Sequence, residues 1–168
     1  MSDNSSFSLA PLTEVSAPYL EWMNDEGVCE FLESRFSTFS ENDLKLYIKE
    51  CSENVNISLF GIFVDEVHIG NIKLHIEPKH SCADVGIVIG NRKYWSQGYG
   101  KKAVEQVKII AKSKDLHKIY CGIYGNNFAS LALFRSCGFI HAGMLKEHYL
   151  HKGKYVDKVW MEYFLNAQ

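Results

Sequence analysis

The chain has 168 residues, and 46% of them are apolar, which is enough for one domain with a full hydrophobic core. Its 18 basic and 20 acidic residues are interspersed and give a formal net charge of -2, without the basic stripe that neutralises a nucleic-acid backbone, so no nucleic-acid partner is expected. No run approaches the roughly 20 apolar residues that cross a bilayer, and the N-terminus resembles no signal peptide, so we expect a single cytoplasmic domain over 1–168 without a membrane partner.

Cysteine and histidine follow no metal-binding pattern. The five cysteines include no CxxC pair, and an odd number cannot all close into disulfides, so reduced thiols are expected. The seven histidines are scattered, with no i, i+4 pair beside a carboxylate. We therefore expect no metal.

The first elements predicted along the chain are a short strand and two helices. Polar and apolar positions alternate over 7–12, as in a strand. Thr13 is the expected N-cap of a first helix that reaches Met23. Residues 24–39 are irregular and rich in aromatics, and Ser40-Glu-Asn-Asp43 resembles a capping box at the start of a second helix.

From position 56 the apolar period changes to that of strands. Residues 57–64 and 67–76 predict a hairpin that turns at Asp65-Glu66, although this is not a favoured turn pair. Residues 83–89 contain Val-Gly-Ile-Val-Ile, which predicts a strand buried on both faces.

The second half of the chain predicts two more helices and three more strands. The helices are expected at 101–112 and 127–137, and the strands at 118–123, 139–149 and 155–164. This order predicts a mixed sheet with helices on both faces, an α/β (α+β) fold. Edge strands near the C-terminus favour a homodimer.

A glycine turn, Trp95-Ser-Gln-Gly-Tyr-Gly100, separates an apolar strand from a helix. The first turn of a helix has N–H groups without an intrahelical partner, and the helix dipole adds partial positive charge there, so phosphate is the natural ligand. Gly98 and Gly100 would let a phosphate approach the amides, and Lys101 and Lys102 add cationic charge. An ordinary turn between strand and helix is the alternative.

A second motif begins at Asn127 and reads Asn-Phe-Ala-Ser-Leu-Ala-Leu-Phe-Arg-Ser-Cys-Gly-Phe. It resembles the fourth-helix motif of the GNAT superfamily of acetyl-CoA-dependent N-acetyltransferases, and the glycine turn upstream matches that superfamily's pyrophosphate loop. Residues 9–24 and 149–157 resemble the branch that holds the Rim-type ribosomal protein acetyltransferases. That branch also includes many small-molecule and sugar N-acetyltransferases.

The resemblance implies a GNAT fold: a mixed, mostly antiparallel central sheet of about seven strands, helices on both faces, and a V-shaped split between the strands at 83–89 and 118–123. Acetyl-CoA would lie in that split, with its pantetheine arm bound like an added strand. The implied contacts are main-chain atoms of Ile87, Val88 and Ile89 for pantetheine, the amides of Gln97, Gly98, Tyr99, Gly100, Lys101 and Lys102 for pyrophosphate, and Asn127, Ser130 and Phe134 for pantetheine and thioester. Asn127 as a plain N-cap, and Ser130 and Phe134 as core residues, are the alternatives.

Two positions depart from the superfamily pattern. Trp95 stands where Arg or Gln usually opens the loop. A Trp at this place is a mark of the Rim-like branch, and a role as a core anchor is the alternative. Phe134 stands where many members have a Tyr placed to protonate the departing thiolate, and Phe has no proton to donate. Another group or water must then supply it, and Cys137 and Tyr124 are nearby in sequence.

Acetyl transfer needs a base, because a primary amine is mostly protonated near pH 7. Asp84, at the start of the strand at 83–89, is the best positional match to the acidic residue that family members often use. A solvated carboxylate at a strand end is the alternative. Glu77, Glu147, His148 and Tyr149 are further candidates, although catalysis would depend mainly on holding amine and thioester together.

Residues for the acceptor come from the early helical region and the final strands, and they are Trp22, Asn24, Arg35, Tyr149 and Asp157. Aromatic rings with a few polar groups suit a ring-bearing substrate, and Arg35 could meet a phosphate. This favours a small-molecule amine such as an amino sugar, including a nucleotide-linked one. A core role for the aromatics is the alternative.

Three other functions remain open from the sequence. The first is acetylation of a protein N-terminus, as in the Rim-type enzymes. The second is a non-catalytic acyl-CoA-binding sensor, which Phe134 supports. The third is a generic α/β nucleotide-binding protein.

Overall fold

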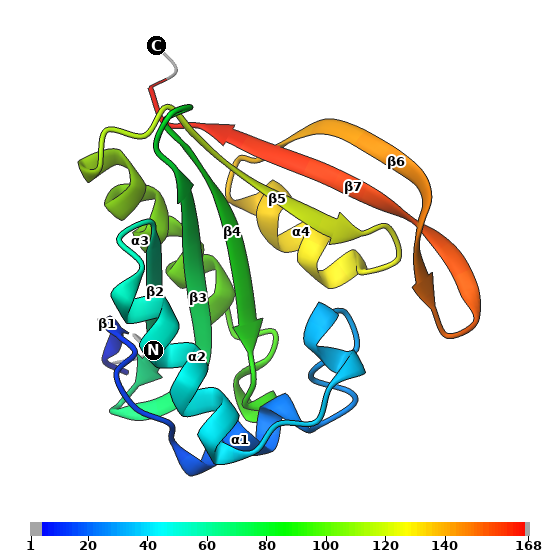
Figure 1. Ribbon diagram of the computed structural model, residues 1–168. Helices are drawn as coiled ribbons and strands as arrows, with labels where there is room; N and C mark the ends of the chain where they lie inside the picture. The colour runs from blue at the N-terminus through cyan, green and yellow to red at the C-terminus, as the bar shows by residue number, and fades with distance from the viewer. Residues whose placement is uncertain (1–4, 167–168) are drawn as a thin grey trace.

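The computed structural model describes residues 5–166. These residues form one seven-stranded sheet in the order β1-β2-β3-β4-β5-β7-β6, together with four α-helices and two short 3-10 helices (Figure 1). The elements in chain order are β1 (Phe7–Pro11), α1 (Ala17–Met23), η1 (Glu33–Phe36), α2 (Glu41–Glu53), β2 (Ile57–Val64), β3 (Val67–Glu77), β4 (Cys82–Ile89), η2 (Arg92–Tyr94), α3 (Tyr99–Ser113), β5 (Lys118–Tyr124), α4 (Phe128–Ser136), β6 (Ile140–His151) and β7 (Lys154–Phe164).

The sheet divides into two antiparallel parts that meet at one parallel pair. Strands β1 to β4 are antiparallel neighbours, and so are β5, β7 and β6. The parallel pair joins only residues 82–84 of β4 to residues 118–120 of β5. Beyond these residues the two strands separate (Figure 1). The expected mostly antiparallel sheet, with a V-shaped split between the fourth and fifth strands, is therefore confirmed.

Helices cover both faces of the sheet. The main hydrophobic core lies on the α3 side and includes Ile72, Leu74, Ile119 and Met161, each at most 1% exposed. A smaller cluster lies on the other face, where α1 and α2 contact β3 and β2. Burying each such Leu or Ile contributes about 1.5–3 kcal/mol, so both layers stabilise the sheet.

The start of the first helix corrects one expectation. Thr13 is not the N-cap; Ser16 is, and its hydroxyl accepts a hydrogen bond from the Tyr19 N–H at 3.2 Å. The reason is Pro18, which has no N–H to donate and is therefore tolerated in the first turn of a helix but not in its interior, where a helix capped by Thr13 would place it. Helix α1 therefore begins at Ala17.

Two other local expectations are confirmed. The Ser40 side chain and the Asp43 side chain form the reciprocal bonds of a capping box at the start of α2. The hairpin between β2 and β3 turns at Asp65 and Glu66, whose φ angles are 48° and 65°. Two consecutive positive φ angles are typical of a tight hairpin turn, even though neither residue is glycine.

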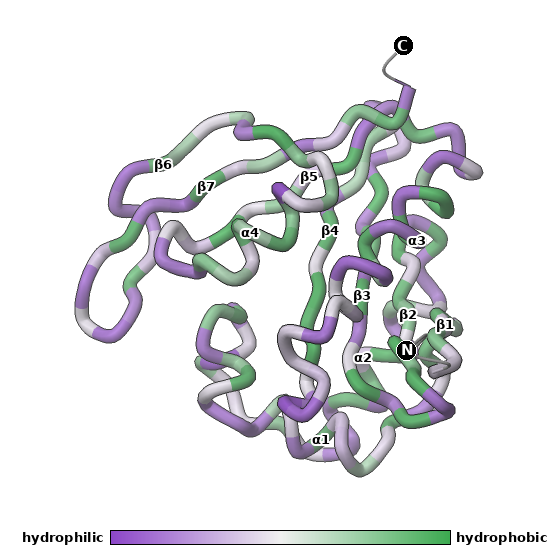
Figure 2. Tube along the Cα trace, turned by 180° about the vertical axis from the view of Figure 1, so that it is seen from behind, coloured by the Kyte–Doolittle hydropathy of each residue, from purple (hydrophilic) through white to green (hydrophobic). Residues whose placement is uncertain are grey.

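Strand β4 is not buried on both faces along its whole length, contrary to the sequence-based expectation. Its first residues are buried, whereas Gly86 is exposed and residues 87–89 are half-buried. The physical reason is the split, because β5 no longer covers β4 after Asp84. Figure 2 shows that this partly open strand is largely hydrophobic.

Among residues 5–166, no helix has both the length and the apolar character needed to cross a membrane.

Candidate active site

The glycine turn lies at the N-terminal end of α3. Gly98 is the N-cap and has a φ of 84°, a left-handed conformation that glycine adopts without strain. It forms no side-chain cap bond, so the amides of the first turn have no side-chain partner there. A Cβ built at Gly98 would have no atom within 4 Å, so the space beside the turn is open. This geometry fits an anion such as a phosphate.

Most side chains around this turn already contact other groups of the protein. The buried Tyr99 ring has its hydroxyl 3.2 Å from the Ser5 hydroxyl, and the Gln97 amide donates to the Lys93 carbonyl. The Lys102 ammonium lies 5.0 Å from the centre of the Tyr99 ring, and Lys101 is exposed. Residues 97–102 could therefore contact an anion mainly through their backbone N–H groups and the two lysines.

The Trp95 side chain connects the turn to the end of β4 by a hydrogen bond. Its indole N–H donates to the Ile89 carbonyl at 2.6 Å. The side chain is 43% exposed, so Trp95 is not the core anchor that the sequence left open. The Arg92 guanidinium lies 5.5 Å from its ring centre.

The open edge of β4 offers backbone groups to an extended ligand. Residues 85–89 pair with β3 on one side and, within residues 5–166, with no strand on the other. An amide-bearing chain can bind to such an edge as an added strand. The predicted residues Ile87, Val88 and Ile89 lie in this segment, although the Ile89 carbonyl is already engaged by Trp95.

Asn127 is the N-cap of α4, which is the role given in the sequence analysis as the alternative to binding pantetheine. Its Oδ1 accepts a hydrogen bond from the Ser130 N–H at 3.1 Å. Its Nδ2 makes no hydrogen bond within the described part of the chain, so this donor is free for a ligand. Phe134 is 2% exposed and packs against Phe139 at 4.9 Å between ring centres, inside the main core.

Asp84 stands at the vertex of the split. It is the last residue of β4 that pairs with β5, where it lies opposite Tyr120, and it lies opposite His75 of β3. Burial raises the pKa of the Asp84 carboxyl, while the charges of Lys73 and Lys158 act in the opposite direction. The carboxylate is therefore a stronger proton acceptor than a solvated one.

Strand alternation places further side chains on the same face of the sheet as Asp84. Tyr120 of β5 and Trp160 of β7 form an edge-to-face pair at 5.9 Å, and the Tyr120 hydroxyl donates to Glu77. Sequence reasoning missed Tyr120, Trp160 and Lys158 as site residues. The alternation within each strand could have been found, but the register that brings β7 beside β5 could not.

A stacked pair of tyrosines lies near the open end of β5. The Tyr149 ring stacks on the Tyr124 ring at 3.8 Å with 6° between the planes. Burial raises the pKa of Tyr149 to about 12, so its phenol is protonated at neutral pH. The Tyr124 hydroxyl donates to Glu33 at 2.5 Å and accepts from Arg35, whose Nη2 donates to the Leu150 carbonyl at 2.8 Å.

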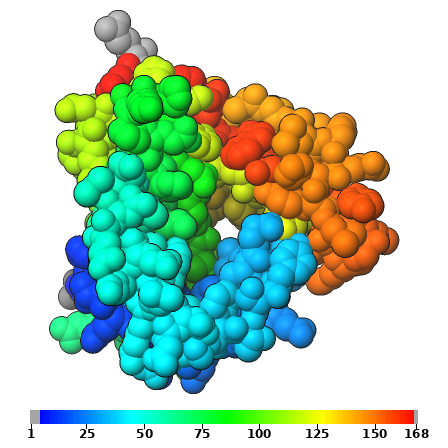
Figure 3. Space-filling model, viewed as in Figure 1, coloured from blue at the N-terminus to red at the C-terminus, as the bar shows by residue number. Residues whose placement is uncertain are grey.

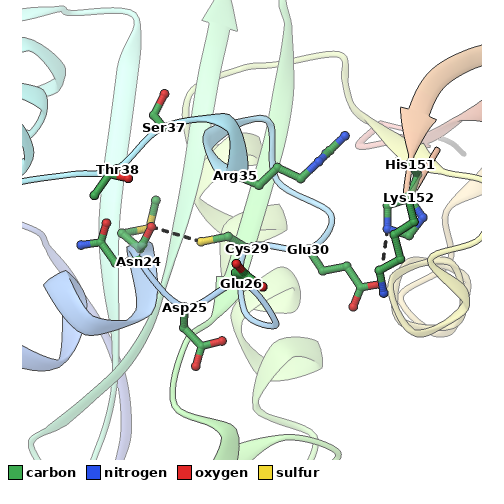
Figure 4. A pocket seen from close by; sticks show the side chains of 11 residues that line it. Asn24, Asp25, Glu26, Cys29, Glu30, Arg35, Ser37, Thr38, His151 and Lys152 are labelled. Carbon is green, nitrogen blue, oxygen red and sulfur yellow. Dashed lines mark hydrogen bonds and ion pairs between the residues drawn. The ribbon is translucent and has the colours of Figure 1, made fainter.

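Residues 24–39 approach the β6–β7 hairpin below the split, and a hollow lies beside them (Figure 3). Glu30 joins the two parts, since its carboxylate accepts from the Lys152 ammonium at 2.5 Å and lies 3.3 Å from the His151 ring (Figure 4). A pocket of about 380 Å³ in this region is lined by Met23, Asn24, Asp25, Glu26, Cys29, Glu30, Arg35, Ser37, Thr38, His151 and Lys152.

Three predicted acceptor residues have structural partners elsewhere. Trp22 is 7% exposed in the smaller core cluster, with its ring 5.0 Å from that of His68. Asn24 binds both backbone groups of Phe39 and so holds the segment 24–39 to the end of α1. Asp157 accepts from the Glu147 N–H at 2.9 Å, where the register of β6 shifts. The structure brings Asp84 and Tyr149 to one face of the sheet, but it does not place Trp22, Asn24 and Asp157 beside them.

All five cysteines are free and buried. Within residues 5–166, no group of three or more His, Cys, Asp or Glu side chains could hold a metal ion.

Comparison with known proteins gives the family. The model of the acetyltransferase (GNAT) domain matches residues 7–140, and the chain therefore belongs to the GNAT acetyltransferases. It is an acetyl-transferring enzyme that uses acetyl-CoA, as expected from the two motifs. The open β4 edge and the uncapped start of α3 fit the pantetheine and the pyrophosphate of this cofactor.

The names of the similar proteins differ in their acceptors: one names no substrate, one names spermidine and one names a ribosomal protein. The chain is 24% identical over 143 residues to an uncharacterized N-acetyltransferase, p20, of Bacillus licheniformis, covering 82% of this chain and 80% of the relative. It is 23% identical over 158 residues to spermidine N(1)-acetyltransferase of Vibrio cholerae, covering 92% and 90%. The solved structure of RimL, a ribosomal alpha-N-protein acetyltransferase in complex with coenzyme A, is similar with a TM-score of 0.85 and 17% identity over 96% of each chain.

Proposed function

We propose that this enzyme transfers the acetyl group of acetyl-CoA to the primary amine of a small molecule, with Asp84 as the base. One observation carries the proposal: β4 and β5 part at Asp84, so a carboxyl with a raised pKa stands at the vertex of the split. Acetyl-CoA supplies an activated acetyl group on a thiolate leaving group. Asp84 would remove the proton from the bound ammonium, directly or through a water.

The residues that would hold the cofactor lie on three neighbouring elements. The backbone of residues 87–89 would bind the pantetheine arm, and the amides of residues 97–102 would bind the pyrophosphate. The free Nδ2 of Asn127 would donate to the pantetheine, with Ser130 beside it. Phe134 would contribute an apolar wall rather than a proton.

Tyr149 is the candidate donor of a hydrogen bond to the departing thiolate, a role that Phe134 cannot fill. Its pKa of about 12 keeps the phenol protonated at neutral pH and lies above that of an ordinary thiol, so the phenol would stabilise the thiolate by a hydrogen bond while water supplies the proton. Stacking on Tyr124 fixes the ring. The Asp84 charge contributes to this raised pKa, so the two groups lie within electrostatic reach of each other.

For the acceptor we propose an amine on a ring-bearing small molecule, such as an amino sugar. Tyr120 and Trp160 are half-buried on the face that carries Asp84, and although the Lys158 ammonium covers one side of the Trp160 ring at 4.0 Å, the remaining aromatic surface suits a ring-bearing ligand. Arg35 is engaged by Tyr124 and Leu150, which argues against its earlier assignment to a nucleotide phosphate.

The test is release of free coenzyme A from acetyl-CoA with a panel of amino sugars, spermidine and peptides with free N-termini. We expect turnover with at least one amine, and we expect Asp84→Asn to lower kcat roughly 100- to 10,000-fold. Asp115→Asn, at an exposed turn after α3, is the matched control.

Two results would contradict the proposal in different ways. Tight acetyl-CoA binding without turnover on any amine would favour a sensor. An unchanged rate in Asp84→Asn would remove Asp84 as the base while leaving the reaction in place.

A further inference from the structure

Two lysines on the Asp84 face have no carboxylate partner. Lys73 of β3 and Lys158 of β7 form no ion pair with any described residue, whereas Lys118 on the same face pairs with Glu162 at 2.7 Å. Both side chains are half-buried. An ammonium has three N–H donors, so each lysine keeps donors for a further acceptor.

Tyrosine and tryptophan rings hold these two ammonium groups in place. Lys73 donates to the Tyr47 hydroxyl at 3.1 Å. The Lys158 ammonium lies 4.0 Å from the centre of the Trp160 ring and 5.5 Å from that of Tyr149. These contacts restrict the side chains without neutralising them.

Two glycines form the floor between the lysines. Gly86 of β4 lies opposite Lys73 in register, and a Cβ built there would have no atom within 4 Å. A Cβ built at Gly122 of β5 would lie 2.5 Å from the Cε of Lys158 and 3.3 Å from its Nζ, so the Lys158 side chain crosses β5 at this glycine. One lysine therefore borders the split from the β3 side and the other from the β7 side.

The charge balance at the split is positive. Asp84 is the carboxylate between the two lysines, and both of their charges act on it. Glu77 lies beyond the vertex, opposite Cys82, and accepts a hydrogen bond from Tyr120. Glu33 and Arg35, whose charges both act on Tyr149, add one charge of each sign, so a polyamine would still meet more like charges than opposite ones.

We infer that Lys73 and Lys158 form an anion subsite beside Asp84, and that the acceptor is a primary amine that also carries a phosphate or a carboxylate. The inference rests on the proposed function, since Asp84 takes the amine. The lysines would bind the anionic group while the amine faces the carboxylate. Among small amines, this selects against spermidine.

The test uses pairs of amines that differ in their anionic group. O-phosphoethanolamine is compared with ethanolamine, and β-alanine with propylamine, so that phosphate and carboxylate are tested separately; spermidine is the polycation. We expect the anionic member to have the higher kcat/KM. We expect Lys73→Met and Lys158→Met each to lower its kcat/KM roughly 10- to 100-fold and to change the neutral member little.

Controls separate charge from folding. Lys158→Arg keeps the cation and should retain the preference for the anionic member. Lys112→Met, in the exposed last turn of α3, should change neither member. Equal kcat/KM within both pairs, a preference for spermidine, or no effect of the two Met variants would overturn the inference.

A second readout keeps the inference separate from the proposed function. If no amine is acetylated, the proposed function fails. Equilibrium binding of the same pairs to the enzyme saturated with coenzyme A then decides the subsite. Tighter binding of the anionic member that is lost in both Met variants supports it, and equal binding overturns it.

Discussion

Burial of the Asp84 side chain gives this residue two opposite consequences. It raises the pKa of the carboxyl, which makes the carboxylate a better proton acceptor. It also disfavours the charged form in the folded state, so the same burial lowers stability wherever the group is ionised. A residue placed for proton transfer is expected to destabilise the fold that carries it.

The stability of Asp84→Asn should therefore depend on pH. The folded-state pKa lies above the ordinary value of 3.8, so below pH 3.8 both the folded and the unfolded chain hold the proton, and the residue has no net effect. As the pH rises through the folded-state pKa, the wild type loses stability. We expect Asp84→Asn to be more stable than the wild type at neutral pH, with the difference vanishing toward pH 3.8. Urea unfolding at several pH values measures this, and a less stable variant at neutral pH would contradict it.

Asn127 allows its two roles to be separated. Its Oδ1 caps α4, whereas its Nδ2 makes no hydrogen bond to any other residue that the structure describes. Asn127→Asp keeps the capping oxygen and removes the donor, so stability should hold while coenzyme A affinity falls about tenfold, for one lost hydrogen bond. Asn127→Ala should lose both, at about 1 kcal/mol of stability. Calorimetric binding and urea unfolding of the two variants check this; full affinity in both would leave Asn127 as a cap alone.

At the scale of the element, the α3 N-terminus combines a left-handed N-cap with unpartnered amides. Gly98 supplies the conformation, and the open space beside it leaves the amides accessible. The strand before it and the helix after it hold the turn, with Trp95 bound to the Ile89 carbonyl. The β6–β7 turn has a glycine of the same kind, since Gly153 has a φ of 76° and no atom within 4 Å of a built Cβ.

These two glycines provide a matched pair of substitutions. Gly98→Ala and Gly153→Ala should lower stability by a similar amount, about 1–2 kcal/mol, because both residues adopt the left-handed conformation. Only changes at Gly98 should weaken coenzyme A binding, and Gly98→Glu should raise the Kd more than tenfold, since a carboxylate would face a pyrophosphate. Isothermal titration measures the Kd. Equal affinity in Gly98→Glu and the wild type would place the pyrophosphate elsewhere.

Across the whole molecule, the sheet has an edge at β6 with exposed apolar side chains. Ile140, Met144, Leu145 and Leu150 are each at least 43% exposed. Edge strands of this kind invite pairing with another chain. The homodimer expected from the sequence is thus still a prediction, and β6 is the surface on which to test it.

The dimer prediction has a direct measurement. Light scattering after size exclusion should give twice the mass of 19.2 kDa, and the double change Met144→Lys with Leu145→Lys should give a single chain. Circular dichroism of the double variant checks that the fold is kept. A monomeric mass for the wild type at micromolar concentration would contradict the prediction.

Contiguous segments account for what could be predicted from the sequence. The capping box at Ser40, the hairpin at Asp65 and Glu66, and the glycine turn each lie within a few residues, so their local chemistry decides their conformation. The cofactor motifs are local in the same way, since Gly98 and Asn127 each begin a helix. The start of α1 was mispredicted because Pro18 cannot lie inside the helix that Thr13 would cap. This is also a local effect.

The acceptor side of the site was decided by tertiary structure. Lys73, Asp84 and Lys158 come from three strands, and only the register of β3 with β4 and of β5 with β7 brings them to one face. Burial in the smaller core cluster occupies Trp22, and the Tyr124 hydroxyl occupies Arg35. By itself, the sequence determined the reaction class and the local conformation of the two turns that are proposed to bind the cofactor, because these depend on neighbouring residues. The charges around Asp84, the proposed base, depend on pairing between distant strands, which no local pattern encodes.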